Sequence, residues 1–478
     1  MSDHDTLDVW LAGKYAGKLR RGEEGLVEFV YDETYMSSPS STPLSLSMPL
    51  GRIGHGYLTT QAWIENLIPE NAKTKDLWAR HFGETRTDAF SLLKHMGLDA
   101  PGAVQIVREG ATPSGQGGFE ELSENQNATR LRDIRETRTT WNLDDDDDIR
   151  YSLAGQQSKF AVVKSGDTWL EPTGRSASTH IVKPGMQSMK TPRYNDQAAE
   201  FLTMRAAQKL GLRVADVDIL FFENEPAFVT KRFDRVQVGD QVVRIHQEDL
   251  CQALGVAPDN KYETDGGPGV VDVGDIISRH SAAPEKDRAF FARALAFNLM
   301  VAGIDGHGKN FSLLLNGGNV RFAPLYDLIS AHPVINAGLL GHKGKMGMRY
   351  GKEDRIRGIN GRNLMRTADA LGYDRGELLV AARAIGQSLP DAFAQSLEEM
   401  PDIPVTDSIR RLPDTAATFV EDRLETINDQ DLETPRYSTR SQLSRFVESR
   451  RGEIWVPGRY RNGRWVTGHY RQSPRARG

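Results

Sequence analysis

The sequence predicts an α+β protein of two lobes, in which a β-rich lobe precedes a mainly helical lobe and a small additional α+β domain stands in front. Two observations support this prediction. Strand-like runs rich in Val, Ile, Phe and Thr recur between residues 150 and 245, whereas apolar residues at helical spacing dominate from residue 246 onward. The chain has 478 residues, 38% of them hydrophobic and 26% charged, which is typical of a folded protein with several packed units.

The first domain is predicted for residues 1–108. Short strands are expected at "DVWLAG", "YAGKL" and "LVEFVYD", because glycine-containing turns separate these runs. Helices are expected at "AWIENLI", "KDLWARHF" and "DAFSLLKHMG", where apolar residues recur at helical spacing and Thr87 and Asp88 offer a cap for the last helix. This order of elements predicts a small α+β domain.

Residues 109–149 read as a linker with a short helix around "LSENQNATRLRDIRETR". The run Asp144 to Asp148 repels itself and stays hydrated. Two interpretations of this run remain open, a solvated linker and a regulatory acidic segment.

Residues 150–245 form the predicted β-rich lobe. Strands are expected at "KFAVVKS", "TWLEP" and "THIVKP", followed by the helix "NDQAAEFLTMRAAQKLG", which Gly211 closes. The segment "VDILFFENEPAFVTKRFDR" predicts two further strands joined at residues 223–226.

Residues 246–445 form the predicted helical lobe, interrupted by one hairpin at "FSLLLNGGNVRFAPL". Residues 446–478 form a basic hairpin or tail, since residues 441–478 contain nine Arg and two Glu. The dipeptide Asn462-Gly463 suits a two-residue turn and predicts that Tyr460 pairs with Trp465. An anion or nucleic-acid contact and a solvated tail are both compatible with this composition.

The net charge of −5 gives the whole chain no electrostatic reason to bind nucleic acid or an anionic membrane, so any such contact is local or made through a partner. The single cysteine, Cys251, excludes an intrachain disulfide and a multi-cysteine metal site and fits a reducing compartment. The chain has no apolar run long enough for a membrane span and no signal-like start, so a cytoplasmic protein without membrane contact is expected.

One loop, "GIDGHGKN" at residues 303–310, gathers several reactive side chains between two apolar runs. Asp305 and Asn310 have the D-x-x-x-x-N spacing with which protein kinases place a base beside a metal-binding amide. By itself this spacing is weak, because a capping Asp and a turn Asn would produce it too. The downstream hairpin returns to Asp327, a candidate second oxygen ligand for Mg²⁺ that could instead cap a helix.

Three upstream features occur in the order in which protein kinases carry them, and phosphoryl transfer needs a cation on the nucleotide phosphates. Gly155 lies in a turn, "YSLAGQQSK", whose backbone N–H groups could face phosphates, although neither G-x-x-x-x-G-K-[ST] nor G-x-G-x-x-G is present and a plain hairpin turn remains an alternative. Lys183 ends an apolar strand, and Glu200 on the next helix is its candidate ion-pair partner. Surface positions for both residues are the competing interpretation.

Several motifs together resemble the HipA family of bacterial serine/threonine kinase toxins from about residue 8 to residue 440. They are "WIENLIPEN", "AFSLLKHMGLDAPGAVQIV", "YSLAGQQSK", "THIVKPG", "RFDR", "HQEDLCQALG", "KYETDGGPG", "GIDGHGKNFS" and "PLYDLISAHPV". The resemblance implies a two-lobed protein-kinase-like fold, ATP and Mg²⁺ as cofactors, and protein serine or threonine as the phosphate acceptor.

The resemblance also implies residue roles. Asp305 would be the catalytic base, and Asn310 and Asp327 would bind magnesium. The remaining ATP-binding positions would be the phosphate loop Ala154, Gly155, Gln156, Gln157, Ser158 and Lys159, together with Lys183, the strand end Lys231, Arg232 and Phe233, and the residues His307, Gly308, Lys309 and Tyr326. Lys231 replaces the acidic residue expected before "RFDR", which matters little if main-chain atoms hold adenine. His307 could instead be a loop histidine without a chemical role.

Ser152 matches the loop serine that such kinases autophosphorylate to inactivate themselves. A phosphate there adds about −1.5 to −2 charges and would repel the nucleotide phosphates. The resemblance further implies the toxin of a type II toxin–antitoxin system that phosphorylates a translation-related protein and inhibits growth. By analogy, the candidate target is an aminoacyl-tRNA synthetase. Its partners would be a small HipB-like helix-turn-helix antitoxin and, through that complex, operator DNA.

Three other functions compete with the toxin kinase. A kinase-shaped corepressor that acts through its antitoxin would show little turnover, and a small-molecule kinase would share the lobes but not the acceptor. A metal-dependent phosphodiesterase would use Asp305 and His307 but would leave Lys183 and the glycine turn without a role.

Overall fold

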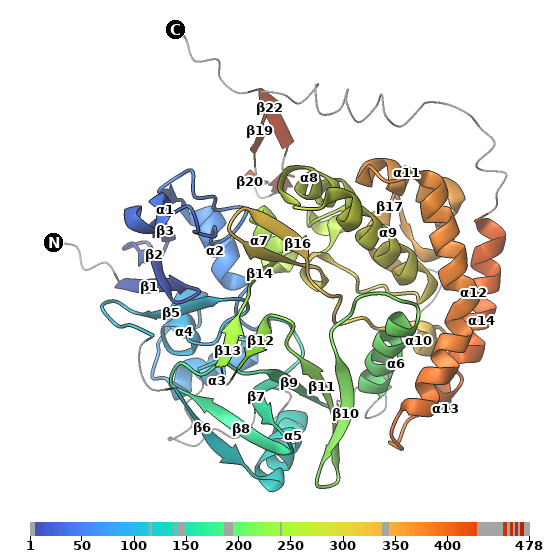
Figure 1. Cartoon of the computed structure of the whole chain (residues 1–478), viewed down its shortest axis with the longest axis horizontal. Helices are drawn as coiled ribbons and strands as arrows, with labels where there is room; N and C mark the ends of the chain where they lie inside the picture. Colours follow the sequence, from blue (N-terminus) through green and yellow to red (C-terminus); the bar gives the residue numbers. More distant parts are fainter. Residues whose placement is uncertain are drawn as a thin grey trace.

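The chain folds into an N-terminal α+β domain, a β-rich lobe and a helical lobe, which lie against one another (Figure 1). The computed structural model describes residues 5–113, 117–137, 139–140, 150–185, 195–239, 241–336 and 344–427, with the four strands between 453 and 472. Within these ranges the predicted α+β class is confirmed.

The N-terminal domain is built on an antiparallel sheet with strand order β4-β3-β2-β1-β5. Its elements are β1 (Asp5–Leu11), β2 (Lys14–Arg21), β3 (Val27–Tyr31), α1 (Glu33–Ser37), β4 (Gly54–His55), α2 (Tyr57–Glu65), α3 (Ala72–His81), α4 (Ala89–Met96) and β5 (Val104–Arg108). The three predicted strands and the three predicted helices are present. Asp88 caps α4, since its carboxylate accepts a hydrogen bond from the Ser91 N–H at 3.0 Å.

The β-rich lobe is a six-stranded sheet with order β10-β11-β9-β7-β8-β6 and the separate hairpin β12–β13. Its elements are β6 (Gly118–Leu122), α5 (Glu124–Thr137), β7 (Phe160–Ser165), β8 (Thr168–Thr173), β9 (His180–Pro184), α6 (Asn195–Lys209), β10 (Val217–Phe222), β11 (Glu225–Lys231), β12 (Arg235–Val238) and β13 (Gln241–Arg244). The helix predicted around "LSENQNATRLRDIRETR" is α5. The turn between β10 and β11 is tighter than predicted and uses only Glu223 and Asn224.

Residues 109–149 differ in part from the predicted linker. Residues 118–122 form the edge strand β6 of the β-rich lobe, paired with β8. Three of its five residues are exposed, so the strand lacks the apolar pattern by which inner strands are recognised. The Asp144 to Asp148 run lies outside the described residues.

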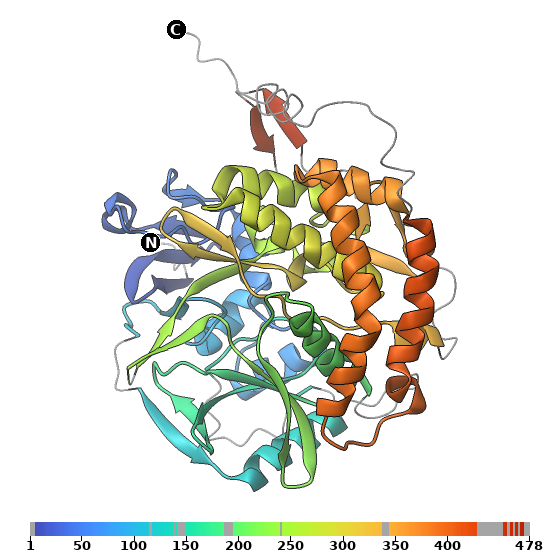
Figure 2. The same ribbon diagram turned by 45° about the vertical axis from the view of Figure 1, so that its right-hand side comes forward.

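The helical lobe carries the small sheet β14-β15-β16, whose β15–β16 pair is the predicted hairpin. Its elements are β14 (His246–Asp249), α7 (Leu250–Leu254), α8 (Val270–His280), α9 (Pro284–Met300), β15 (Ser312–Asn316), β16 (Asn319–Phe322), α10 (His332–Asn336), β17 (Lys345–Tyr350), β18 (Glu353–Arg355), α11 (Gly361–Leu371), α12 (Arg375–Glu399), α13 (Asp407–Arg410) and α14 (Leu412–Thr426). Figure 2 shows α12 and α14 side by side along the outer edge of this lobe, with α6 of the β-rich lobe against α12.

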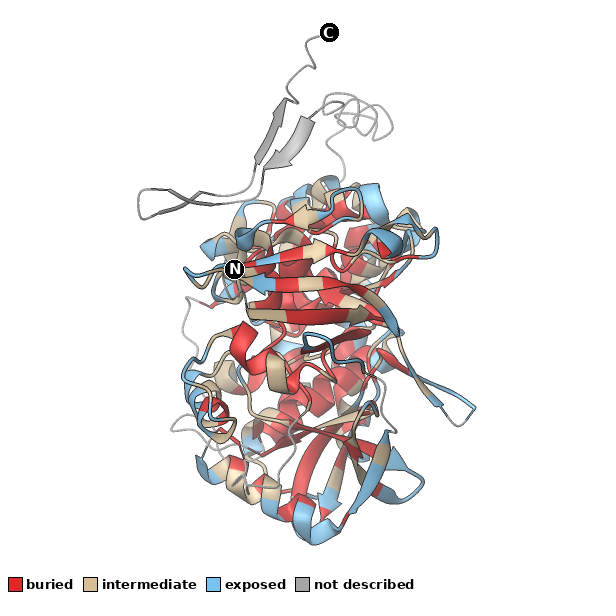
Figure 3. Cartoon of the chain, turned by 90° about the vertical axis from the view of Figure 1, so that its left-hand side faces the viewer, coloured by how far each residue is buried: buried red, intermediate tan, exposed pale blue. Residues whose placement is uncertain are grey.

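Two hydrophobic cores hold these parts together, and each contains residues from more than one part. Figure 3 shows the buried residues along the strands and helices of the interior. One core joins the N-terminal sheet to the β-rich sheet, for example Val9 with Phe160 and Val182. The other unites the helical lobe with α6 and with Phe228 on β11. Because the N-terminal domain shares its core with the β-rich lobe, the two form one packed body.

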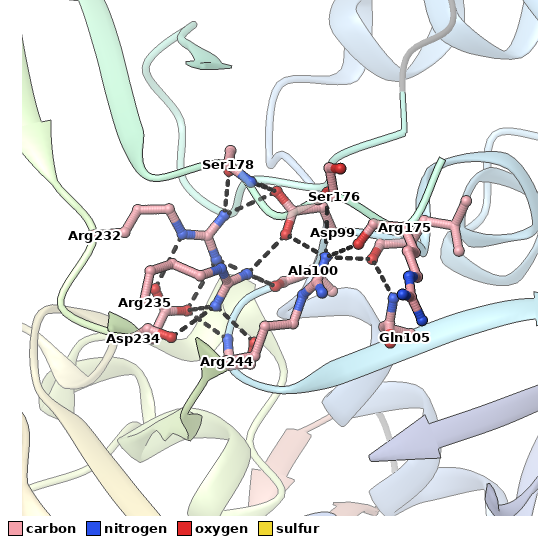
Figure 4. A network of polar contacts seen from close by, with 12 residues as sticks. Asp99, Ala100, Gln105, Arg175, Ser176, Ser178, Arg232, Asp234, Arg235 and Arg244 are labelled. Atoms are coloured by element: carbon pink, nitrogen blue, oxygen red, sulfur yellow. Dashed lines mark hydrogen bonds and ion pairs between the residues drawn. The ribbon is translucent and has the colours of Figure 1, made fainter. Parts of the chain in front are cut away.

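A buried network of charged side chains joins the N-terminal domain to the β-rich lobe (Figure 4). The Asp99 carboxylate receives the guanidinium groups of Arg235 at 2.8 Å, Arg244 at 3.3 Å and Arg232 at 3.5 Å. Asp234 pairs with Arg232 and Arg235, each at 2.9 Å. Burial alone would raise the pKa of Asp99, but the three guanidinium groups outweigh burial and hold it well below its ordinary value.

Replacing Asp99 by Asn is expected to destabilise the protein by about 3–5 kcal/mol, because the buried Arg232 and Arg235 would share the single carboxylate of Asp234 and the half-buried Arg244 would lose its carboxylate partner. Urea unfolding at pH 7 measures this loss. The wild-type advantage should also disappear in acid, since a carboxylate with a lowered pKa stabilises the fold only while it is ionised. Asp369→Asn removes an ion pair whose partners are 32% and 36% exposed, and it should cost less than about 1 kcal/mol. Equal effects of the two substitutions would contradict the importance of this network.

The strands near the C-terminus pair in two hairpin-like units, β19 (Glu453–Val456) with β22 (His469–Gln472) and β20 (Arg459–Arg461) with β21 (Arg464–Val466). The predicted pairing of Tyr460 with Trp465 is confirmed. The turn residues Asn462 and Gly463 lie outside the described residues.

In the described ranges, none of the helices combines the length and the apolar character needed to cross a membrane.

Candidate active site

A buried lysine stands at the centre of the site, where the β-rich lobe meets the helical lobe. Lys183 lies on β9, and its ammonium donates to both carboxylate oxygens of Glu200 on α6, at 2.7 and 3.0 Å. The same ammonium donates to Asp327 Oδ1 at 2.8 Å. Lys183 is 7% exposed and Glu200 3%, whereas Asp327 remains 40% exposed. The structure therefore brings the three predicted residues together, with the open side at Asp327.

The charges in this cluster influence one another. Burial alone would lower the pKa of Lys183, but the carboxylates of Asp327 and Glu200 raise it, so the ammonium stays charged. Burial would raise the pKa of Asp327, but Lys183 and Lys159 outweigh burial and lower it, so this carboxylate stays ionised. The pKa of Glu200 rises to about 7, first because the carboxyl group is buried.

Asp327 adopts an unusual backbone conformation that directs its carboxylate to Lys183. Its φ is +56°, in the left-handed region that Asp tolerates better than most residues. The alternative role of a helix cap does not apply, because the next helix, α10, begins only at His332.

The loop between α9 and β15 carries the other predicted reactive groups. Asn310 Nδ2 donates to the backbone oxygens of Asp305 at 3.1 Å and Asp327 at 3.4 Å, which leaves the amide oxygen as the atom that could bind a metal. Asp305 is 57% exposed, so its carboxylate is accessible from outside. His307 is buried with Nε2 3.8 Å from Asp305 Oδ1, and burial lowers its pKa, which favours a neutral imidazole beside the predicted base.

The predicted phosphate loop lies beside Lys183. Gly155 has φ +108°, which favours glycine, and an added Cβ would lie 2.8 Å from Lys159 Nζ. Lys159 Nζ donates to the Ala154 oxygen at 2.8 Å, and burial together with the charge of Lys183 lowers its pKa to about 8. Gln156 is exposed, and Gln157 and Ser158 are half-buried.

Ser152, at the base of this loop, is fully buried. Its hydroxyl donates to the backbone oxygen of Leu67 at 2.5 Å, and its N–H donates to the backbone oxygen of Asp99 at 3.3 Å. The loop also rests on the N-terminal domain through the Glu70 N–H, which donates to the Gly155 oxygen at 3.1 Å. A phosphate on Ser152 would therefore require this part of the chain to move.

Two predicted ATP-binding side chains point elsewhere. The Lys309 ammonium donates to Asn66 Oδ1 at 2.6 Å and lies 3.7 Å from Glu70 Oε1, so it faces the N-terminal domain. It also lies 3.5 Å from Asp249 Oδ2 at the end of β14 in its own lobe. Arg232 is committed to the network around Asp99. Any nucleotide contact at these two positions is therefore restricted to the main chain.

At the strand end after β11, two main-chain donors are already occupied. The N–H groups of Lys231 and Arg232 donate to the backbone oxygens of Asp216 and Thr179, each at 2.9 Å. Phe233 packs on Tyr326 with ring centroids 5.5 Å apart, and the Tyr326 hydroxyl donates to the Lys309 oxygen at 2.6 Å. The adenine contact predicted for residues 231–233 is thus limited to the carbonyl groups and the Phe233 N–H.

Three residues that contact the site, Glu70, Lys261 and Tyr262, have no predicted role. Glu70 pairs with Lys261 at 2.8 Å and lies 3.7 Å from Lys309. Tyr262 donates to Asp305 Oδ1 at 2.5 Å. All three lie in quoted motifs, "WIENLIPEN" and "KYETDGGPG", but a motif does not reveal which distant side chain its residues meet.

The geometry resolves into two halves with different tasks, a cationic strand-and-loop side that can receive phosphates and an acidic loop side that can receive a proton. Their meeting at the junction of a β-rich and a helical lobe is the arrangement of a kinase-like protein. The protein therefore has a two-lobed, kinase-like fold.

Comparison with known proteins identifies the family. The model of the HipA-like C-terminal domain matches residues 151–395, and that of the HipA N-terminal domain matches residues 7–107. The chain belongs to the HipA family. The protein Y4mE of Sinorhizobium fredii is 33% identical over 83% of this chain and 93% of its own length.

Two further relatives come from Shewanella oneidensis. Its serine/threonine-protein kinase toxin HipA is 31% identical over 76% of this chain and 83% of its own length. A solved complex of the HipA and HipB toxin–antitoxin system with its operator DNA from the same organism contains a chain that superposes with a TM-score of 0.76. That chain is 26% identical, and the match covers 90% of this chain and all of the other.

Proposed function

We propose that this protein is an ATP- and Mg²⁺-dependent serine/threonine protein kinase and the toxin of a toxin–antitoxin pair. The observation that carries the proposal is the contact of Lys183 with both Glu200 and Asp327, because a charged lysine beside a helix glutamate and a partly exposed carboxylate is the combination that kinases use. Membership of the HipA family supports the same activity.

The residues present fit a magnesium ion held together with nucleotide phosphates. Asp327 offers an ionised and partly exposed carboxylate, and Asn310 offers an amide oxygen. Mg²⁺ commonly takes one or two protein oxygens and fills its other positions with phosphate oxygens and water. Among the described residues no cluster of three or more His, Cys, Asp or Glu side chains could hold a metal alone, which agrees with a site completed by the nucleotide. When bound, magnesium neutralises charge on the β- and γ-phosphates.

The protein groups then divide the work of phosphate transfer. Lys183 and Lys159 hold the triphosphate, and the main chain of residues 154–159 surrounds it. Asp305 accepts the proton of the acceptor hydroxyl, and the oxygen of that hydroxyl attacks the γ-phosphorus. The bond from the γ-phosphorus to the bridging oxygen breaks, and ADP leaves with that oxygen.

The regulatory and partner roles follow from the same proposal. Phosphorylation of Ser152 would break its hydrogen bond to Leu67 and expel the phosphate loop, since a dianion does not fit a fully buried site.

The partners are a HipB-like antitoxin and, through it, operator DNA, as in the complex from Shewanella oneidensis. The protein acceptor belongs to the translation machinery, with an aminoacyl-tRNA synthetase as the candidate.

Purified protein incubated with radiolabelled ATP and Mg²⁺ should label itself and proteins of a lysate, and EDTA should abolish both signals because the phosphates would lose their counter-charge. Ser152→Ala should lose self-labelling and keep lysate labelling. Binding of ATP without any labelling would favour the corepressor, and labelling of metabolites alone would favour a small-molecule kinase.

A further inference from the structure

The motif "KYETDGGPG" forms a compact loop against the loop at residues 303–310, and its side chains have no part in the proposed phosphate transfer. It runs through the 3-10 turn at Glu263–Asp265 to the start of α8. The Tyr262 hydroxyl at its beginning donates to Asp305 Oδ1 at 2.5 Å. The Tyr262 ring also meets His307 edge-on, with centroids 4.9 Å apart. Tyr262 therefore contacts both the predicted base and its neighbour.

The loop that carries Tyr262 is fixed from inside. The backbone oxygen of Tyr262 accepts hydrogen bonds from the N–H groups of Asp265 at 3.0 Å and Gly267 at 2.8 Å. A Cβ on Gly267 would lie 2.7 Å from that oxygen and 2.2 Å from the Asn260 oxygen, so only glycine permits this close turn. The Tyr262 backbone is thus held before any substrate arrives.

The loop is also fixed from outside. Lys261, next to Tyr262, pairs with Glu70 of the N-terminal domain at 2.8 Å, and its backbone oxygen accepts the Gly308 N–H at 3.1 Å. On the other side, Glu263 accepts the Arg349 N–H of β17 at 2.6 Å. Three separate parts of the molecule therefore determine where the phenol lies.

The two oxygens of Asp305 have different surroundings. Oδ1 receives the Tyr262 hydroxyl and lies 3.8 Å from His307 Nε2. Among the described residues, none donates a hydrogen bond to Oδ2, and the Asp305 side chain is 57% exposed. A carboxylate held at one oxygen by a fixed donor keeps its other oxygen in a defined direction.

We propose that Tyr262 is a positioning residue that holds Asp305 through Oδ1, so that Oδ2 accepts the proton of the acceptor hydroxyl. The inference rests on the proposed kinase function and adds to it the atom that takes the proton and the loop that aims it. The N-terminal domain contributes to catalysis in this way, through Glu70 and Lys261.

Steady-state kinetics of Tyr262→Phe test the proposal. The phenylalanine keeps the ring against His307 and removes only the donor. We expect kcat to fall on the order of 10- to 100-fold, because a misaimed base loses rate although nucleotide binding is intact. KM for ATP should stay within about twofold of the wild-type value, and the thermal midpoint should stay within about 2 °C. A merely structural tyrosine would change the midpoint or both kinetic constants.

Two comparisons make the test specific. Tyr35→Phe removes a hydroxyl that donates to the Thr42 oxygen in the N-terminal domain, and it should leave kcat unchanged. In an Asp305→Asn background, Tyr262→Phe should cause no further loss, because the two residues act as one unit.

The phenol itself gives a reading that needs no turnover. Burial, the hydrogen bond to Asp305 and the charge of Asp305 together raise the pKa of Tyr262. NMR of ring-labelled tyrosine should therefore show this phenol titrating at lower pH in Asp305→Asn than in wild type.

Wild-type kcat in Tyr262→Phe, together with loss of activity in Asp305→Asn, would overturn the inference and leave the proposed function intact. Equal labelling by wild type and Asp305→Asn would overturn the proposed function, and the inference with it.

Discussion

Asp305→Asn is expected to lower kcat by about 10²- to 10⁴-fold, the usual contribution of a general base. The amide has the shape of the carboxylate but does not take the proton of the acceptor hydroxyl. Because the side chain is 57% exposed, the fold should be unaffected. Initial rates at saturating ATP measure the loss, and a thermal melt verifies the fold.

Asp402→Asn is a matched control for this substitution, since Asp402 is an exposed aspartate on the loop between α12 and α13. It should retain wild-type rates. Full activity of Asp305→Asn would exclude Asp305 as the base and would direct attention to Asp327, the other partly exposed carboxylate of the site.

Lys183→Met is expected to abolish measurable phosphate transfer and to destabilise the fold. Methionine has a similar length but no charge, so the triphosphate loses its buried cation. The substitution also leaves the carboxyl group of Glu200, which is 3% exposed, without its partner, a loss of about 3–5 kcal/mol at a pH where that group is ionised. Transfer of label from radiolabelled ATP and urea unfolding measure the two effects separately, and a nucleotide titration shows whether binding is lost.

The instability of Lys183→Met should depend on pH in a defined direction. The pKa of Glu200 is raised to about 7 even beside Lys183, above its ordinary value of 4.5, and loss of the ammonium raises it further. A carboxyl group with a raised pKa costs least while it is protonated. The destabilisation should therefore be small near pH 5 and grow as the pH rises through 7.

The double variant Lys183→Met/Glu200→Leu separates burial of charge from catalysis. Two apolar side chains should recover most of the lost stability, because a buried ion pair can often be replaced without loss. Activity should stay absent. Nucleotide binding and transfer at wild-type level in either variant would contradict the assignment of Lys183.

The local structure followed largely from the sequence, because its signals are local. The helix "NDQAAEFLTMRAAQKLG" appears as α6, the strand "THIVKP" as β9, and the turn at Asn462-Gly463 predicted the pairing of Tyr460 with Trp465. The edge strand β6 was not predicted, since an exposed strand at the sheet edge lacks the apolar periodicity that marks inner strands.

The order of Lys183, Glu200, Asp305, Asn310 and Asp327 was sufficient to predict a kinase-like site, because residue type and spacing determine which chemistry a chain can perform. The sequence predicted the ion pair of Lys183 with Glu200, which the structure shows, but not the direct contact of Lys183 with Asp327. The positive φ of Asp327, which turns its carboxylate to Lys183, depends on the packing around it and not on a local pattern.

The sequence by itself determined the elements, the family and the set of reactive groups, since each depends on local periodicity or on residue identity. Only the tertiary structure decided that Lys309 and Arg232 face the N-terminal domain and that Tyr262 meets Asp305. The physical reason is that such contacts join residues 43 to 243 positions apart, and the packing of two shared cores selects among many possible partners for each charged side chain.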